Sequence, residues 1–268
     1  MKAICIAASF IMLFTAACFS PRIVSPDAPV YFVQITDTHR GNPLHAERLK
    51  KAVDIINNLP VPVSAVIHTG DLACDNLAEP GVAEAISNDF SAVKAPMLFV
   101  PGNHDITKGR ADLCAGAFTN SIGPLASELV TNGIAFLAVY SEPLRIGTNV
   151  SVTGFSPLEW LSSAVERNRG CPVFVFHHAP AHPDFYNNSF HDTWPEESKS
   201  AWNGILSRGH VIAEICGHLH RNELHWNDDG IPSYCAPAIA DFWGRQGSIR
   251  LYRYSGGRLS YSTIYIED

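Results

Sequence analysis

Seven side chains suited to metal binding occur in short polar clusters spread over most of the chain. They comprise two carboxylates, one amide and four imidazoles: Asp37, His39, Asp71, Asn103, His177, His218 and His220. Mixed oxygen and imidazole donors suit Mn, Fe or Zn, whereas Ca and Mg prefer oxygen alone. Seven donors are too many for one tetrahedral ion and match two ions that share a carboxylate, as in phosphoryl transfer. The clusters therefore predict a two-metal centre.

The spacing within the clusters allows neighbouring donors to reach one site. Asp37 and His39, like His218 and His220, are two residues apart, and such residues project to the same side of an extended segment. Glycines precede donors at Gly70, Gly102 and Gly217. Glycine permits the backbone angles and the close approach that a sharp turn requires. We therefore expect the donors to face a common crevice.

Five apolar runs end directly in these clusters, at residues 31–36, 63–69, 96–101, 172–176 and 212–216. Strands are expected at 31–36, 64–68, 96–100, 134–140, 173–176 and 211–216, and helices at 46–58, 82–92, 157–168 and 196–207. The tail at 232–266 alternates and predicts antiparallel strands. This alternation of strands and helices predicts an α/β domain, in which ligand sites gather beyond the carboxyl ends of strands.

In this order, the motifs D-x-H, G-D, G-N-H-D, H-H and G-H-x-H resemble the signature of the calcineurin-like metallophosphoesterases. The local segments QITDTH, HTGDL, VPGNHD and CGHLHR are most similar to the class III cyclic nucleotide phosphodiesterase and glycerophosphodiesterase branch. The resemblance spans residues 31–222 and depends on the whole set of motifs. It implies a single α/β domain at 30–268, a four-layer αββα sandwich with two mixed β-sheets.

The resemblance also implies a division of the donors between two divalent metal ions. The first ion would be held by Asp37, His39 and His220, with Asp71 as the bridge. The second would be held by Asn103, His177 and His218. A hydroxide between the ions would be the nucleophile, because metal coordination lowers the pKa of bound water to about 7.

Further residues are assigned to catalysis and substrate binding. By the same resemblance, His104 would contact the phosphate and donate a proton or a hydrogen bond to the leaving oxygen, and Asp105 would orient His104. Arg40 and Arg221 each follow a ligand pair, so either could contact the phosphate or be solvated. His178 could support the metal ligands or touch the substrate.

Other residues near the motifs have less specific interpretations. The segment 181–197 is rich in aromatic and His residues and predicts a specificity loop at the substrate rim. His68 lies inside a strand and is interpreted as structural, and Phe242 and Trp243 are expected to pack or to line the rim.

The N-terminus resembles a targeting segment. Residues 1–17 read as a signal peptide, followed by a linker at 18–29, and the apolar run is shorter than the roughly 20 residues that span a bilayer. Residues 14–18 resemble a bacterial lipobox, so Cys18 is either a lipid anchor or merely near an ordinary cleavage site. The chain is expected to be exported, as a periplasmic protein, a membrane-anchored lipoprotein facing the periplasm, or a secreted protein. Export also makes disulfides possible, and the loops favour a Cys74–Cys114 pair.

Composition limits the partners. The formal charge is −7 and the Lys and Arg residues form no stripe, so binding of a nucleic acid duplex is not expected. The leading interpretation is a phosphodiesterase that hydrolyses a small organic phosphodiester or nucleotide, other than the cytoplasmic pool of cAMP. The alternatives are a phosphomonoesterase of the same fold and, from a different class, a non-catalytic metal-binding envelope protein.

Overall fold

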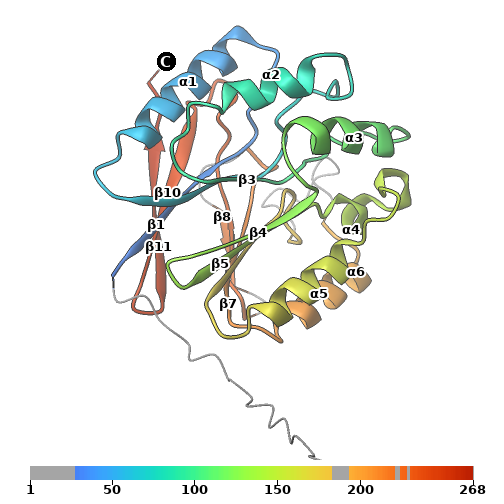
Figure 1. Cartoon of the computed structure of the whole chain (residues 1–268), viewed down its shortest axis with the longest axis vertical. Coiled ribbons are helices and arrows are strands. Elements are labelled where there is room, and N and C mark those ends of the chain that lie inside the picture. Colours follow the sequence, from blue (N-terminus) through green and yellow to red (C-terminus); the bar gives the residue numbers. More distant parts are fainter. Residues whose placement is uncertain (1–27, 183–192, 221–223, 228–229, 268) are drawn as a thin grey trace, which may run out of the picture.

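Two β-sheets pack face to face, and helices cover both outer faces (Figure 1). The computed structural model describes residues 28–182, 193–220, 224–227 and 230–267. The expected four-layer sandwich is therefore confirmed. Within these residues, none of the helices combines the length and apolar character needed to cross a membrane.

The first sheet has the strand order β11-β10-β1-β2-β3. Its three parallel strands are β1 (Val30–Ile35), β2 (Val63–His68) and β3 (Met97–Phe99). Ile35 pairs with His68 and His68 with Phe99, so the carboxyl ends of these strands are level. An antiparallel hairpin of β10 (Ser248–Ser255) and β11 (Arg258–Tyr265) completes the sheet, as predicted for this part of the alternating tail.

The second sheet has the order β4-β5-β6-β7-β9-β8. Its parallel centre is made of β5 (Ile134–Val139), β6 (Val173–Phe176), β7 (Val211–Cys216) and β9 (Ser233–Cys235). The edge strands β4 (Ala126–Thr131) and β8 (Leu224–Trp226) run antiparallel to their neighbours. Both sheets are thus mixed, with parallel strands next to the functional loops.

The helices divide between the two outer faces. The first sheet is covered by α1 (Pro43–Asn57), α2 (Val82–Asp89) and α3 (Ala111–Ser121). The second is covered by α4 (Glu142–Ile146), α5 (Pro157–Arg167) and α6 (Glu196–Leu206), with a short 3-10 turn, η1 (Thr148–Val150), after α4. α1 and α5 each start with a capping side chain followed by proline, which satisfies a free backbone N–H and sets a helical φ.

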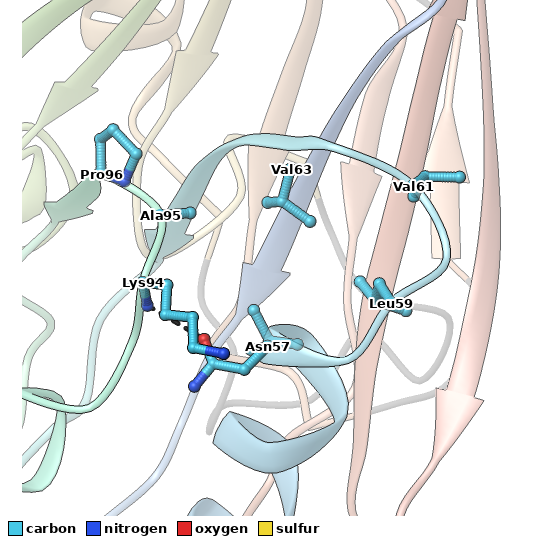
Figure 2. A pocket seen from close by; sticks show the side chains of 8 residues that line it. Asn57, Leu59, Val61, Val63, Lys94, Ala95 and Pro96 are labelled. Carbon is cyan, nitrogen blue, oxygen red and sulfur yellow. Dashed lines mark hydrogen bonds between the residues drawn. The ribbon is translucent and has the colours of Figure 1, made fainter.

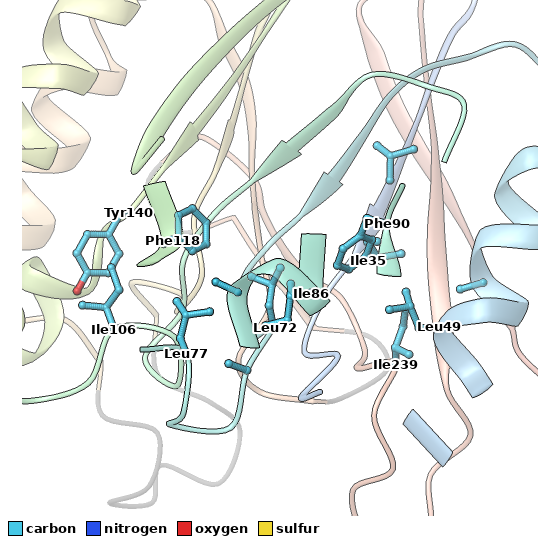
Figure 3. Packing of buried hydrophobic residues seen from close by; sticks show 14 of the residues in the cluster. Ile35, Leu49, Leu72, Leu77, Ile86, Phe90, Ile106, Phe118, Tyr140 and Ile239 are labelled. Atoms are coloured by element: carbon cyan, nitrogen blue, oxygen red, sulfur yellow. The ribbon is translucent and has the colours of Figure 1, made fainter. Parts of the chain in front are cut away.

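Three clusters of buried apolar residues lie between the four layers of helices and sheets and hold them together. Between the sheets, Phe32 is fully buried, stacks on Tyr252 at 4.9 Å between ring centres and meets Phe136 edge-on at 5.2 Å. One outer layer joins the first sheet to α1–α3 through residues such as Ile35 and Phe118 (Figure 3). Burial of large apolar side chains on both faces of each sheet is the main source of stability.

The sequence-based prediction did not include several elements that are short or weakly patterned. These are α3, α4, β4 and β8, among which β4 is a half-exposed edge strand. The expectation of a Cys74–Cys114 disulfide was wrong, because both residues are free thiols. Cys114 is buried in α3 with Sγ 3.6 Å from Thr107 Oγ1, whereas Cys74 is exposed.

Candidate metal centre

Loops from both sheets meet at one edge of the sandwich. The backbone N–H of Asp37, after β1, donates to the carbonyl of Gly70, after β2, at 2.9 Å. Gly217, after β7, donates in the same way to the carbonyl of His178, after β6, at 2.8 Å. The Asp37 carboxylate joins the two sheets, because its Oδ2 accepts the backbone N–H of His218 at 3.1 Å.

The first donor group combines two carboxylates and two imidazoles: Asp37, His39, Asp71 and His220. One donor atom from each lies within 4.8 Å of all the others. His39 Nε2 is 3.4 Å from His220 Nε2 and 3.6 Å from Asp71 Oδ2, and His220 Nε2 is 3.1 Å from Asp37 Oδ1. The structure thus brings together the four residues that the sequence assigned to the first ion and the bridge.

The second donor group shares Asp71 with the first and adds His178 and His218. His178 Nε2 is 3.1 Å from Asp71 Oδ2 and 3.3 Å from His218 Nδ1. Asn103 joins this group, because its Oδ1 is 3.2 Å from His178 Nε2. The Asp71 carboxylate therefore lies where a bridge between two ions is expected.

His177 lies outside both groups, contrary to the sequence-based expectation. Its Nε2 is 3.2 Å from Glu214 Oε2, and its ring meets Trp202 edge-on at 5.4 Å. The alternation of a β-strand explains this difference. Val173 and Val175 of β6 face the helix layer and Phe174 and Phe176 face the other sheet, so His177 follows the former and His178 the latter.

The donor geometry fits metal ions. Nitrogen and oxygen ligands lie about 2.0–2.2 Å from Zn, so neighbouring ligands around one ion are about 3–4 Å apart. Within the first group, His220 Nε2 is 3.1 Å and His39 Nε2 is 3.9 Å from Asp37 Oδ1, and one donor atom from each residue lies within 4.8 Å of the others. Since all four side chains are buried or nearly so, bulk water does not solvate the two carboxylates.

The two carboxylates attract positive charge strongly. Burial acts to raise the pKa of Asp37, but the charge and hydrogen bond of His220 outweigh it and lower that pKa. Asp71 is affected in the same way by His178, and its pKa is also lowered. Burial acts to lower the pKa of His178, yet Asp71 raises it to about 10. A pair of buried carboxylates with this demand for cationic partners suits divalent ions.

Five of the donors have a left-handed backbone: Asp37 (φ 52°), His39 (φ 42°), Asp71 (φ 57°), His218 (φ 70°) and His220 (φ 54°). This conformation costs about 1–2 kcal/mol for a residue with a side chain. The hydrogen bonds between loops hold the strained backbone in place and aim alternate side chains at one point.

Gly102 and Gly217 are needed for close packing rather than for an unusual backbone angle. A Cβ on Gly217 would collide with Thr36 Oγ1 and lie 2.7 Å from Asp37 Oδ2. A Cβ on Gly102 would collide with the Asp71 carboxylate. Of the three motif glycines, Gly70 alone is left-handed, with φ 102°.

His104 lies at the rim of the site, with its ring 5.1 Å from that of His39. Its backbone N–H donates to Asp71 Oδ1 at 2.9 Å, and its Nδ1 is 3.0 Å from Asp75 Oδ1. Burial lowers the pKa of His104, but the charges of Asp71 and Asp75 produce a net rise. The resemblance assigned the partner role to Asp105, whereas the structure pairs His104 with Asp75. The closeness of Asp75 to Asp71 in the sequence was the available signal.

Asp105 instead braces the loops around Asp71. Its carboxylate is fully buried and accepts the backbone N–H groups of Leu72, Ala73 and Gly102 at 3.2, 2.8 and 2.8 Å. Burial, together with the charge of Asp71, raises the pKa of Asp105 to about 7. His68 also supports these loops: it is buried, and its Nδ1 accepts the Gly70 N–H at 3.2 Å, in agreement with a structural role.

The expected phosphate partners are placed differently. The Arg40 side chain is paired with Asp89, with Nε 2.7 Å from Oδ2. Arg221 and residues 183–192 of the expected specificity loop lie outside the described residues, as do the signal peptide and Cys18. His178, expected as a supporting or substrate-binding residue, belongs to the second donor group.

A surface hollow at the other end of the first sheet is separate from this centre. Figure 2 shows its lining, which includes Asn57, Leu59, Val61, Val63 and Lys94. Val63 begins β2, whereas the donor loops follow the carboxyl ends of the strands. The hollow therefore does not contribute to the donor groups.

Comparison with known proteins adds an independent result. Residues 30–222 match the family described as calcineurin-like phosphoesterase. The chain is 27% identical over 200 residues to a probable cyclic nucleotide phosphodiesterase from Rhodopseudomonas palustris, covering 71% of each chain.

Solved structures share the fold. A dimetal phosphatase from Danio rerio is 16% identical to this chain, with a TM-score of 0.62. The superposition covers 89% of this chain and 99% of the other. GAP50, an anchor in the inner membrane complex of Plasmodium, is 13% identical, with a TM-score of 0.58 and 90% of each chain covered. At these identities the likeness concerns the fold alone.

Proposed function

The chain belongs to the calcineurin-like phosphoesterase family, and from this premise we propose that it is an exported phosphodiesterase. It is a dimetal phosphoesterase and hence a hydrolase of phosphate esters. The proposed substrate is a small organic phosphodiester or nucleotide. One observation carries this function: two donor groups share the carboxylate of Asp71.

The residues around this carboxylate have distinct proposed tasks. The first ion is assigned to Asp37, His39 and His220, and the second to Asn103, His178 and His218, with Asp71 shared. When bound, such ions supply an activated water and neutralise the developing negative charge of the phosphoryl group. The protein contributes the rigid, water-poor frame that keeps these donors in position.

His104 is the proposed proton donor to the leaving oxygen. The hydrogen bond between Nδ1 and Asp75 fixes one ring nitrogen, so Nε2 is the atom that serves the substrate. His104 is 40% exposed, which lets it reach an ester at the rim. Asp75 is then a positioning residue, because it acts through the ring of His104.

A diester preference is favoured by the name of the Rhodopseudomonas relative, a probable cyclic nucleotide phosphodiesterase. A phosphomonoesterase remains the near alternative, because the same pair of ions serves both reactions. A non-catalytic role is the alternative from another class. The presence of His104 beside a complete donor set favours catalysis over that alternative.

We include export in the proposal because residues 1–18 have the pattern of a signal peptide. They combine a charged start, an apolar run and a lipobox-like end at Cys18. An exported phosphodiesterase meets nucleotides and phospholipid headgroups rather than the cytoplasmic pool.

The first prediction concerns the ester class. With Mn added, the protein is expected to hydrolyse bis(p-nitrophenyl) phosphate faster than p-nitrophenyl phosphate, measured by nitrophenolate release. Asn103→Ala and His104→Ala should each reduce turnover of the diester by about 100-fold or more, because they remove a metal donor and the proton donor. Faster turnover of the monoester would support the phosphomonoesterase, and no turnover of either ester across Mn, Fe and Zn would support the binding protein.

The second prediction concerns Asp75. Asp75→Asn should reduce kcat about tenfold with little change in KM or in metal content, because it loosens the hold on the His104 ring without touching a metal donor. Glu47→Gln is the matched control, since Glu47 is a carboxylate 60% exposed on α1. An unchanged kcat for Asp75→Asn would contradict the positioning role.

The third prediction concerns the anchor. Cells that express the full chain and are fed a labelled fatty acid should yield a labelled protein, and Cys18→Ser should abolish the label. If neither protein carries the label, Cys18 is not a lipid anchor, and the protein is then expected in the soluble periplasmic or secreted fraction.

A further inference from the structure

The loop that follows β9 is fixed directly against the donor loops. The backbone N–H groups of Ile239 and Ala240 donate to the carbonyls of Thr36 and Asp37, each at 3.1 Å. The buried guanidinium of Arg48 donates to the carbonyl of Arg245 at 3.1 Å. Both ends of the segment 239–245 are therefore held, and its middle is presented at the rim of the metal centre.

Two aromatic residues occupy this middle part. The ring of Phe242 stacks on His220 at 3.9 Å between centres and meets His39 at 4.9 Å, so it covers the first donor group. The ring of Trp243 lies farther out, 5.8 Å from Phe242 and 5.9 Å from His220. Phe242 therefore lies next to the donors, and Trp243 lies between Phe242 and the protein surface.

Two features of Trp243 are energetically unfavourable, namely its exposure to solvent and its backbone conformation. It is 68% exposed, the most exposed large apolar side chain among the described residues. Its φ is 58°, a left-handed conformation that is unusual for a bulky residue. Exposed aromatic surface and a strained backbone, next to a catalytic centre, are together typical of a ligand-binding position.

A cationic side chain lies over the ring of Trp243. The guanidinium carbon of Arg245 is 5.9 Å from the centre of the Trp243 ring. A ligand that joins a flat ring to a phosphate would find an aromatic surface in Trp243 and a positive charge in Arg245. Stacking on an aromatic side chain is tolerant of base identity, because every base has a π-face.

We propose that Trp243, backed by Phe242, is a stacking surface for a planar ring that the ester substrate carries. This inference rests on the proposed phosphodiesterase function and adds the part of the substrate that the metal centre does not recognise. A ring stacked on Trp243 gains affinity, whereas a phosphate that carries only a sugar gains none at this position.

The test compares two ligands that differ only in the base. AMP and ribose 5-phosphate are titrated into the Mn-loaded full chain, and binding is measured by isothermal titration calorimetry. The wild type should bind AMP about 10- to 100-fold more tightly than ribose 5-phosphate. Trp243→Ala should abolish this preference by weakening AMP binding alone, and Trp243→Phe should retain most of it.

Val130→Ala is the matched control. Val130 is an apolar residue 53% exposed on β4, and it pairs with Ala135 at the amino end of β5, away from the donor loops. Equal affinity of the wild type for both ligands, or a preference for AMP that survives in Trp243→Ala, would overturn the stacking surface while leaving diester hydrolysis intact. If the protein hydrolyses no ester but still prefers AMP in a way that depends on Trp243, the stacking surface is supported and the proposed phosphodiesterase function is contradicted.

Discussion

The carboxylate of Asp71 is the point on which the rest of this molecule depends. It is buried, it belongs to both donor groups, and its second oxygen also accepts the backbone N–H of His104. A single side chain is thus shared by both donor groups and also holds the backbone of His104, the proposed proton donor. The supporting contacts serve this arrangement: Asp105 holds the loop that carries Asp71, and Gly102 leaves room for its carboxylate.

A sandwich of two sheets is what makes such sharing possible. The first sheet supplies the carboxylates through the loops after β1 and β2, and the second supplies imidazoles through the loops after β6 and β7. The apolar layer around Phe32 packs the two sheets together, and the hydrogen bond from the His218 N–H to Asp37 joins their loops at one edge. Strained left-handed residues at that edge then turn the donors inwards, at a cost that packing and hydrogen bonds between loops offset.

Much of this arrangement was predictable, because apolar runs that end in polar clusters identify parallel strands and a site at their carboxyl ends. The sequence could not show whether His177 or His178 is the metal donor, because that depends on which face of β6 meets the other sheet. Asp75 was also missed, because its closeness to Asp71 in the sequence does not reveal that the loop folds it against His104. The edge strand β4 and helix α3 lack the strong pattern that revealed the buried strands.

The count of bound metal ions tests the central claim most directly. Elemental analysis of the purified protein, after saturation with Mn and removal of free metal, should give two ions per chain for the wild type. His178→Ala should retain one ion and His177→Ala should retain two, because only His178 faces Asp71. Loss of an ion in His177→Ala with full occupancy in His178→Ala would contradict the shared carboxylate centre described above.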